Sequence, residues 1–152
     1  MIVSFFGHAQ FQATAEYERK ILAFLEEHVG EQCADLYLGN HGDFDRFAYY
    51  CCKKYQETHA NASLIFVTPY LTVEYQRNHL AGQKSRFDGI IYPEIEDKPL
   101  RFAITYRNQW MVEQSDYVVC CISHDFGGAY KAYQYAKRKK KSIFNVTGKL
   151  FS

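Results

Sequence analysis

Long apolar runs, acidic residues near the C-terminus and cysteine pairs at metal-binding spacing are all missing from this 152-residue chain. No apolar stretch approaches the ~20 residues that a membrane-spanning helix needs, so we expect no membrane partner. The N-terminus lacks the basic region and long apolar run of a secretory signal. Disorder is excluded, because 47% of the residues are hydrophobic and 17% are aromatic. The length predicts a single domain over residues 1–152.

The five cysteines are Cys33, Cys51, Cys52, Cys120 and Cys121. Their number is odd and two pairs are sequence neighbours, which argues against a disulfide framework. No Cys or His spacing fits a zinc site, so we predict no metal. We interpret all five as reduced thiols that serve as small apolar residues, which predicts a reducing, cytoplasmic location.

The formal net charge of +1 hides an uneven distribution. Residues 131–152 hold seven Lys and Arg and no acidic residue, and five of the seven form the run 137–141. Such a run can contact nucleic acid or phosphate. We favour a solvated helix end, because cations complement the dipole at a helix C-terminus.

Short apolar runs alternate with amphipathic stretches along the whole chain. The predicted strands are Ile2–Phe6, Asp35–Leu38, Ser63–Thr68, Asp116–Ser123 and Ser142–Val146, with a strand-like fragment at 90–92. Helices are predicted over Ala15–Val29 with Thr14 as its cap, after Asp43 as the next cap, around Thr72–Ala81, over Arg101–Gln114, and from Gly127-Gly128 onward. Residues 82–89 are predicted to be irregular.

This alternation predicts an α/β fold, a Rossmann-like three-layer sandwich with a mostly parallel sheet of about five main strands in the order 3-2-1-4-5. Ligands of such sheets bind outside the carboxyl ends of the strands, where the strand order reverses. Here that point lies between the first strand and the strand at 116–123. The loops that follow these strands are therefore where we expect a ligand.

Glycine occurs in each of those loops. Gly7-His8 follows the first strand, Gly39-Asn40-His41-Gly42 follows the second, and Gly127-Gly128 opens the last helix. Glycine lets backbone N–H groups approach an anion closely, and a helix N-terminus adds about half a positive charge, so these loops suit phosphate. Neither G-x-G-x-x-G nor a Walker A motif is present. The alternative is that these glycines only form tight turns.

Four side chains near these loops are further candidates for ligand binding. Arg107 offers bidentate contacts to phosphate or carboxylate, with a surface arginine as the alternative. Lys131 lies in the first turn of the last helix, where a cation opposes the dipole unless an anion lies between them. Asp45 can hold a ribose hydroxyl or simply complement a helix dipole. His8 can donate a hydrogen bond, act as acid or base, or pack in a turn.

The order of several motifs resembles the SLOG superfamily, from about residue 2 to residue 146. The matching segments are Phe6-Gly7-His8, residues 39–45, Pro69-Tyr70, residues 101–104, residues 107–113, Gly127-Gly128-Ala129 and residues 135–139. SLOG groups the LOG (Lonely Guy) phosphoribohydrolases, the DNA-processing protein Smf/DprA and YpsA-like proteins. The resemblance implies a Rossmann-like domain that binds nucleotides or nucleotide-derived molecules, often as a homodimer or higher homo-oligomer.

The LOG enzymes pair an arginine in the helix before the central strand with a P-G-G-x-G-T-x-x-E loop. Arg107 and Gly127-Gly128 match by position, but no carboxylate follows Gly128 in the last helix. Cleavage of an N-glycosidic bond passes through an oxocarbenium-like state that a carboxylate stabilises. Asp45 or Asp125 would have to take that role. A Cys121–His124 nucleophile–base pair is disfavoured, because an apolar strand raises the pKa of a thiol. No catalytic residue is assigned.

We therefore expect a protein that binds a nucleotide or nucleotide-derived ligand, with a role as a sensor, and with no bound cofactor. The expected partners are a nucleotide-like small molecule and further copies of the chain, and we do not expect nucleic acid. The first alternative is a nucleoside 5′-monophosphate phosphoribohydrolase. The least favoured alternative is a protein associated with single-stranded DNA, for which the basic run at 137–141 is the motive.

Overall fold

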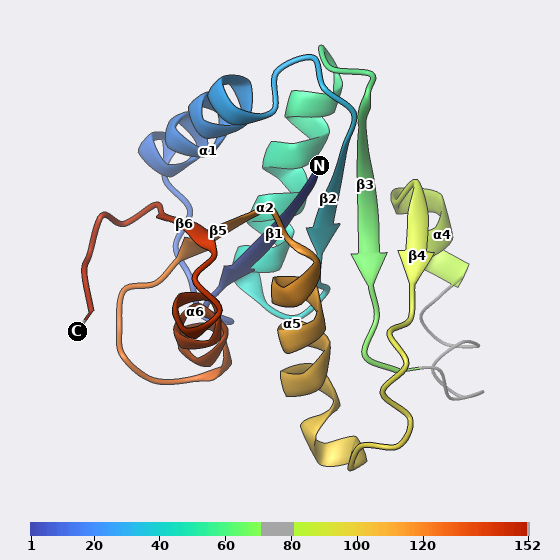
Figure 1. Cartoon of the computed structure of the whole chain (residues 1–152). Coiled ribbons are helices and arrows are strands. Elements are labelled where there is room, and N and C mark those ends of the chain that lie inside the picture. The colour runs from blue at the N-terminus through green and yellow to red at the C-terminus, as the bar shows by residue number, and fades with distance from the viewer. Residues whose placement is uncertain (71–80, 152) are drawn as a thin grey trace.

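The computed structural model describes residues 1–70 and 81–151 and contains a six-stranded sheet (Figure 1). The strands are β1 (Ile2–Gly7), β2 (Ala34–Leu38), β3 (Ala62–Val67), β4 (Gly89–Ile91), β5 (Tyr117–Cys121) and β6 (Ser142–Asn145). Their order is β4-β3-β2-β1-β5-β6, and each neighbouring pair is parallel. The Rossmann-like α/β prediction is confirmed. The five main strands have the predicted order, but the fragment near residue 90 adds a sixth strand at the edge beside β3.

Helices cover both faces of this sheet (Figure 1). They are α1 (Ala15–His28), α2 (Asp43–Gln56), α4 (Ala81–Arg86), α5 (Ala103–Gln114), which a 3-10 turn η2 (Leu100–Phe102) precedes, and α6 (Gly128–Arg138). Helices α1 and α2 pack together on one face, and α5 and α6 pack together on the other. Most of the helix predicted at Thr72–Ala81 lies outside the described residues. Residues 82–86 are helical where an irregular stretch was predicted.

The helix starts show which capping predictions were right. The Thr14 hydroxyl accepts a hydrogen bond from the N–H of Tyr17 at 3.1 Å, as predicted for the N-cap of α1. The prediction that Asp43 caps α2 was wrong. Gly42 holds the N-cap position with φ +103°, and Asp43 is the first helical residue. Its carboxylate pairs with Arg46 and accepts from the N–H of Phe11.

The strands divide their side chains between two core layers, because successive strand residues point to opposite faces. Phe5 of β1 joins the layer under α1 and α2, whereas Phe6 joins the layer under α5 and α6. In β5, Val119 and Cys121 face the first layer, and Val118 and Cys120 face the second. The uniformly apolar sequence of β5 thus reflects burial on both faces.

Four of the five cysteines are free thiols buried in these layers, as predicted, but Cys33 is exposed. The interpretation of Cys33 as an apolar core residue was therefore wrong. It lies just before β2, outside the strand that would have buried it. Burial raises the pKa of Cys51 and of Cys121 to about 12, which keeps both thiols protonated.

Gly7 ends β1 at a place where no side chain fits. A Cβ at this position would overlap the ring of Phe44, which is fully buried in the first turn of α2. The φ of Gly7 is not positive, so close packing and not backbone conformation requires glycine here. The end of β1 and the start of α2 are consequently in direct contact.

We predict that Gly7→Ala lowers the free energy of unfolding by about 1–3 kcal/mol, because overpacking must displace Phe44. Chemical denaturation measures the change. Gly82→Ala is the matched control, because a Cβ at Gly82 meets no atom within 4 Å. Equal stability of the two variants would contradict the packing role of Gly7.

Candidate functional site

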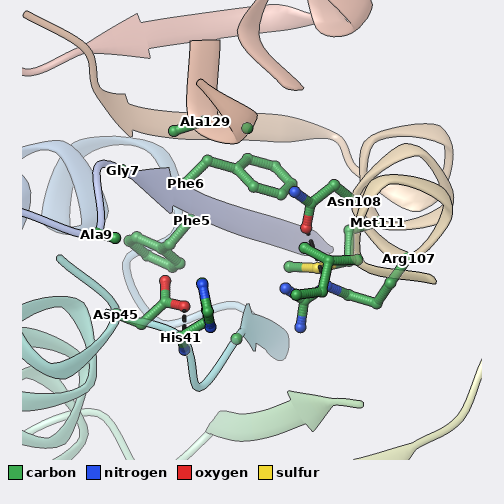
Figure 2. A pocket seen from close by; sticks show the side chains of 13 residues that line it. Phe5, Phe6, Gly7, Ala9, His41, Asp45, Arg107, Asn108, Met111 and Ala129 are labelled. Atoms are coloured by element: carbon green, nitrogen blue, oxygen red, sulfur yellow. Dashed lines mark hydrogen bonds between the residues drawn. The ribbon is translucent and has the colours of Figure 1, made fainter. Parts of the chain in front are cut away.

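A cavity of about 200 Å³ opens at the carboxyl ends of β1 and β2 (Figure 2). It lies at the predicted point, where the strand order reverses: β2 is the neighbour of β1 on one side, and β5 is its neighbour on the other. Its lining comes from β1 and the loops that follow β1 and β2, and from α2, α5 and the first turn of α6. The lining residues are Phe5, Phe6, Gly7, Ala9, Gly39, His41, Asp45, Ile104, Arg107, Asn108, Met111, Gly128 and Ala129.

Asp45 and Arg107 enter the cavity from opposite sides, from α2 and α5 (Figure 2). Gly39 lies against both: a Cβ there would stand 2.7 Å from Asp45 Oδ2 and 3.2 Å from each terminal nitrogen of Arg107. The missing side chain therefore leaves room for the carboxylate and the guanidinium. This is a packing reason for the glycine that sequence reasoning had assigned to a phosphate or to a turn.

Arg107 is only 4% exposed and is held firmly. Its Nη1 donates to the carbonyl of Val67 at 2.7 Å, and its Nε donates to Asn108 Oδ1 at 2.9 Å. The alternative of a surface arginine is therefore wrong. The guanidinium is a fixed positive charge at the wall of the cavity, oriented before any ligand arrives.

The carboxylate of Asp45 accepts a hydrogen bond from the N–H of His41 at 2.8 Å. Burial raises the pKa of Asp45 above its usual value, while the charge of Arg107 and the His41 N–H act in the opposite direction. Asp45 is the one carboxylate among the thirteen lining residues. The cavity wall thus combines one cation and one carboxyl group, so it is not uniformly positive.

The N-terminus of α6 forms the third polar wall. Gly127 has φ +91° and holds the N-cap position without a side-chain hydrogen bond, and Gly128 begins the helix. The first N–H groups of a helix have no acceptor within it and carry partial positive charge. A Cβ at Gly127 or Gly128 would meet no atom within 4 Å. At Gly128 neither packing nor φ requires glycine, so the space in front of this turn is open to a ligand.

The structure separates the predicted site residues into two groups. Gly7, Gly39, His41, Asp45, Arg107 and Gly128 line the cavity. Asn40 lines an adjoining cavity of about 170 Å³, which also touches His41 and Arg107. His8, Gly42, Gly127 and Lys131 do not line the cavity at the ends of β1 and β2. Gly42 is needed at the start of α2, where a Cβ would overlap Ala9, and Lys131 is exposed on α6.

Sequence reasoning missed the apolar lining and the side chains that α5 contributes. Ile104, Asn108 and Met111 face the cavity together with Arg107. Their spacing of three and four residues places them on one side of a helix, which is the signal that was available. Among the described residues, no three His, Cys, Asp or Glu side chains gather as metal ligands would.

His8 is buried under the loop after β5 and not in the cavity. Its ring stacks on His124 at a centroid distance of 3.5 Å, and its Nε2 accepts a hydrogen bond from the N–H of Ser123 at 3.1 Å. Burial, and then the nearby His124, lower the pKa of His8 to about 4. His8 therefore stays neutral near pH 7 and holds the loop in place. This matches the alternative of a packed turn residue.

The basic run 137–141 lies at the other end of α6 from the cavity. The helix from Gly128 to Arg138 has 11 residues, which corresponds to about 16 Å between its ends. Residues 137–140 are exposed, as expected of a solvated helix end. Lys141 Nζ donates to the carbonyls of Glu113 and Ser115 at 3.1 Å each, at the C-terminal end of α5.

Neither a family model nor a curated protein matches the sequence. Among solved structures, the chain is similar to DNA processing protein A from Helicobacter pylori, whose structure is described for its single-stranded DNA binding mode. The TM-score is 0.62 at 16% sequence identity, and the match covers 95% of this chain and 64% of that one. The chain thus spans less than two thirds of that protein. The similarity shows that the two chains share a fold, and it leaves the resemblance to the SLOG superfamily a prediction.

This similarity contradicts the prediction of partners. We expected a nucleotide-like small molecule and further copies of the chain, and no nucleic acid, yet a protein of the same fold binds single-stranded DNA. The exclusion of nucleic acid is therefore withdrawn, and no finding supports a homo-oligomer. As for membranes, none of the helices in the described ranges is long and apolar enough to span one.

We predict that acidification destabilises the protein through His8. Its pKa of about 4 in the folded state lies below the usual histidine value of 6.5, so the unfolded chain binds more protons between these values. Stability is then complete above about pH 6.5 and falls as the pH drops toward 4, by at most roughly 3 kcal/mol. Denaturation at several pH values measures the slope. His8→Phe keeps a ring against His124 without a titratable group, and an unchanged slope in this variant would contradict the prediction.

Proposed function

We propose that the cavity binds the sugar–phosphate unit of a nucleotide, either free or within a single strand. The observation that carries the proposal is the open first turn of α6, which faces a cavity with a fixed guanidinium and a single carboxyl group. Helix N-termini with glycine bind phosphate through their free N–H groups and positive dipole end. The free, buried thiols support a reducing compartment such as the cytoplasm.

The phosphate belongs at Gly128 and Ala129. Their N–H groups begin α6, and the missing Cβ of Gly128 allows an anion to come close. The ionised form of Asp45 would repel a phosphate at the opposite wall, and this repulsion favours the end at α6. Arg107 adds a positive charge whose orientation is already fixed by Val67 and Asn108.

The sugar belongs between α6 and Asp45. A carboxylate accepts hydrogen bonds from hydroxyl groups, and Asp45 is held in place by the His41 N–H. The cavity of about 200 Å³ is smaller than the ~300–1,000 Å³ of pockets that enclose a whole drug-sized ligand. It therefore suits one part of a nucleotide, and the base extends out of it.

The phosphoribohydrolase alternative would need Asp45 to act as the carboxylate of glycosidic cleavage. Asp45 belongs to α2, whereas the glutamate of the LOG pattern follows the paired glycines in the last helix. Binding without cleavage is the function that this arrangement favours. Release of free base from AMP would instead support the phosphoribohydrolase alternative.

Gly128→Ala tests the phosphate position. The added methyl group meets no protein atom and replaces glycine in a helix, so stability is unchanged or higher by up to ~1 kcal/mol. We expect it to weaken binding of ribose 5-phosphate and AMP about tenfold or more, since it occupies the space of the anion. Isothermal titration measures both ligands and an oligothymidylate, which distinguishes a free nucleotide from a single strand.

Gly82→Ala is the matched control for this experiment, because its Cβ also meets nothing and it lies on α4. It should leave all affinities unchanged. If the wild type binds none of the three ligands, or if Gly128→Ala binds them equally well, the proposed site is wrong.

Binding of single-stranded DNA is the second candidate function. The similar protein from Helicobacter pylori is described as binding such DNA, and residues 137–140 form an exposed basic run at the far end of α6. A strand that reached this run from the cavity would follow α6 over about 16 Å. Lysines on such a path would bind phosphates without reading the sequence.

Reversal of charge at Lys139 and Lys140 tests this path. The double variant Lys139→Glu/Lys140→Glu should weaken oligothymidylate binding and reduce the salt dependence of log K by roughly 0.7 for each lost phosphate contact. Fluorescence anisotropy at several salt concentrations measures the slope. Lys53→Glu/Lys84→Glu makes the same charge change at exposed positions on α2 and α4. Identical slopes for the two double variants would exclude the basic run as a DNA contact.

A further inference from the structure

Three aromatic rings form a continuous stack at the carboxyl edge of the sheet. His8 stacks on His124 at 3.5 Å with 19° between the ring planes, and His124 stacks on Phe126 at 3.8 Å with 20°. His8 follows β1, and the other two rings belong to the loop between β5 and α6. The stack therefore joins two neighbouring strand ends.

The inner end of the stack is firmly held and the outer end is open. His8 is 7% exposed and accepts the Ser123 N–H, which ties the loop to the end of β1. Phe126 is 65% exposed, although one face of its ring lies against His124. The other face of the ring is therefore exposed to solvent. The stack forms a platform, because the contact with His124 restricts the rotation of the Phe126 side chain.

This platform lies beside the first turn of α6. Phe126 directly precedes Gly127 and is two residues from Gly128. Consecutive Cα atoms are ~3.8 Å apart, so the Cα atoms of Phe126 and Gly128 lie within ~7.6 Å of each other. A base that extends from a phosphate at Gly128 is long enough to span this distance to the exposed ring of Phe126.

We infer that the outer face of Phe126 stacks against the base of the nucleotide whose sugar–phosphate unit occupies the cavity. This inference rests on the proposed function and adds the part of the ligand that the cavity is too small to enclose. Stacking on an aromatic side chain accepts any base, because every base has a π-face. The site would therefore bind nucleotides with little preference among bases.

The test compares ligands with and without a base in two variants. Stacking is worth about 1–3 kcal/mol per base, so Phe126→Leu should weaken AMP binding about 5- to 100-fold. Ribose 5-phosphate has no base, and its affinity should stay the same. Phe126→Tyr keeps the ring and should retain AMP affinity. An oligothymidylate and a matching abasic oligomer make the same comparison for a single strand.

Tyr50→Leu is the matched control, because Tyr50 is 53% exposed on α2 and takes no part in the stack. If wild type binds ribose 5-phosphate but Phe126→Leu leaves AMP affinity unchanged, the stacking inference is overturned and the proposed function stands. An equal loss for ribose 5-phosphate and AMP would also overturn it, since Phe126 would then act through the loop and not through the base. If the wild type binds neither ribose 5-phosphate nor AMP nor the oligothymidylate, the proposed function itself fails.

Discussion

The close contact between the first turn of α2 and the ends of β1 and β2 is the constraint on which the candidate site depends. Neighbouring residues of α2 use the space left by two glycines: Phe44 lies against Gly7, and Asp45 lies against Gly39. A side chain at Gly7 would push Phe44 and the start of α2 away from the sheet, and a side chain at Gly39 would displace the carboxylate of Asp45. The position of Asp45 opposite Arg107 therefore follows from missing atoms on the strands as much as from the helix itself.

A different rule applies to the glycines on the other side of the cavity. Gly127 needs its positive φ, but a Cβ at Gly127 or Gly128 would touch nothing. The packed glycines shape the cavity, and the open ones leave its entrance free. We use this contrast to distinguish a packing role from the proposed ligand role among residues that look alike in the sequence, and it is why we propose the phosphate at α6 and not at the start of α2.

The polar groups of the site are ordered before any ligand binds. Arg107 is bonded to Val67 and Asn108, and Asp45 is bonded to the His41 N–H. The entropic cost of ordering these groups when a ligand binds is therefore small. The fold that the chain shares with DNA processing protein A from Helicobacter pylori places such groups at the carboxyl ends of parallel strands, where ligands of open α/β sheets bind. At 16% identity the similarity concerns the fold, and the ligand has to be argued from this chain's own residues.

The α/β class, the order of the five main strands and the edge at which the cavity opens could be predicted from the sequence alone. These follow from local periodicity and from the topological rules of parallel sheets, so β5 could be recognised from its apolar run alone. The edge strand β4 was seen only as a fragment, because three residues carry little periodic signal. The stack of His8 on His124 and the packing of Gly42 against Ala9 became visible only in the folded structure. The structure also showed that the side chains of Arg107 and Asp45 both lie against Gly39. Such roles depend on atoms from elements far apart in the chain, and local sequence patterns do not encode those contacts.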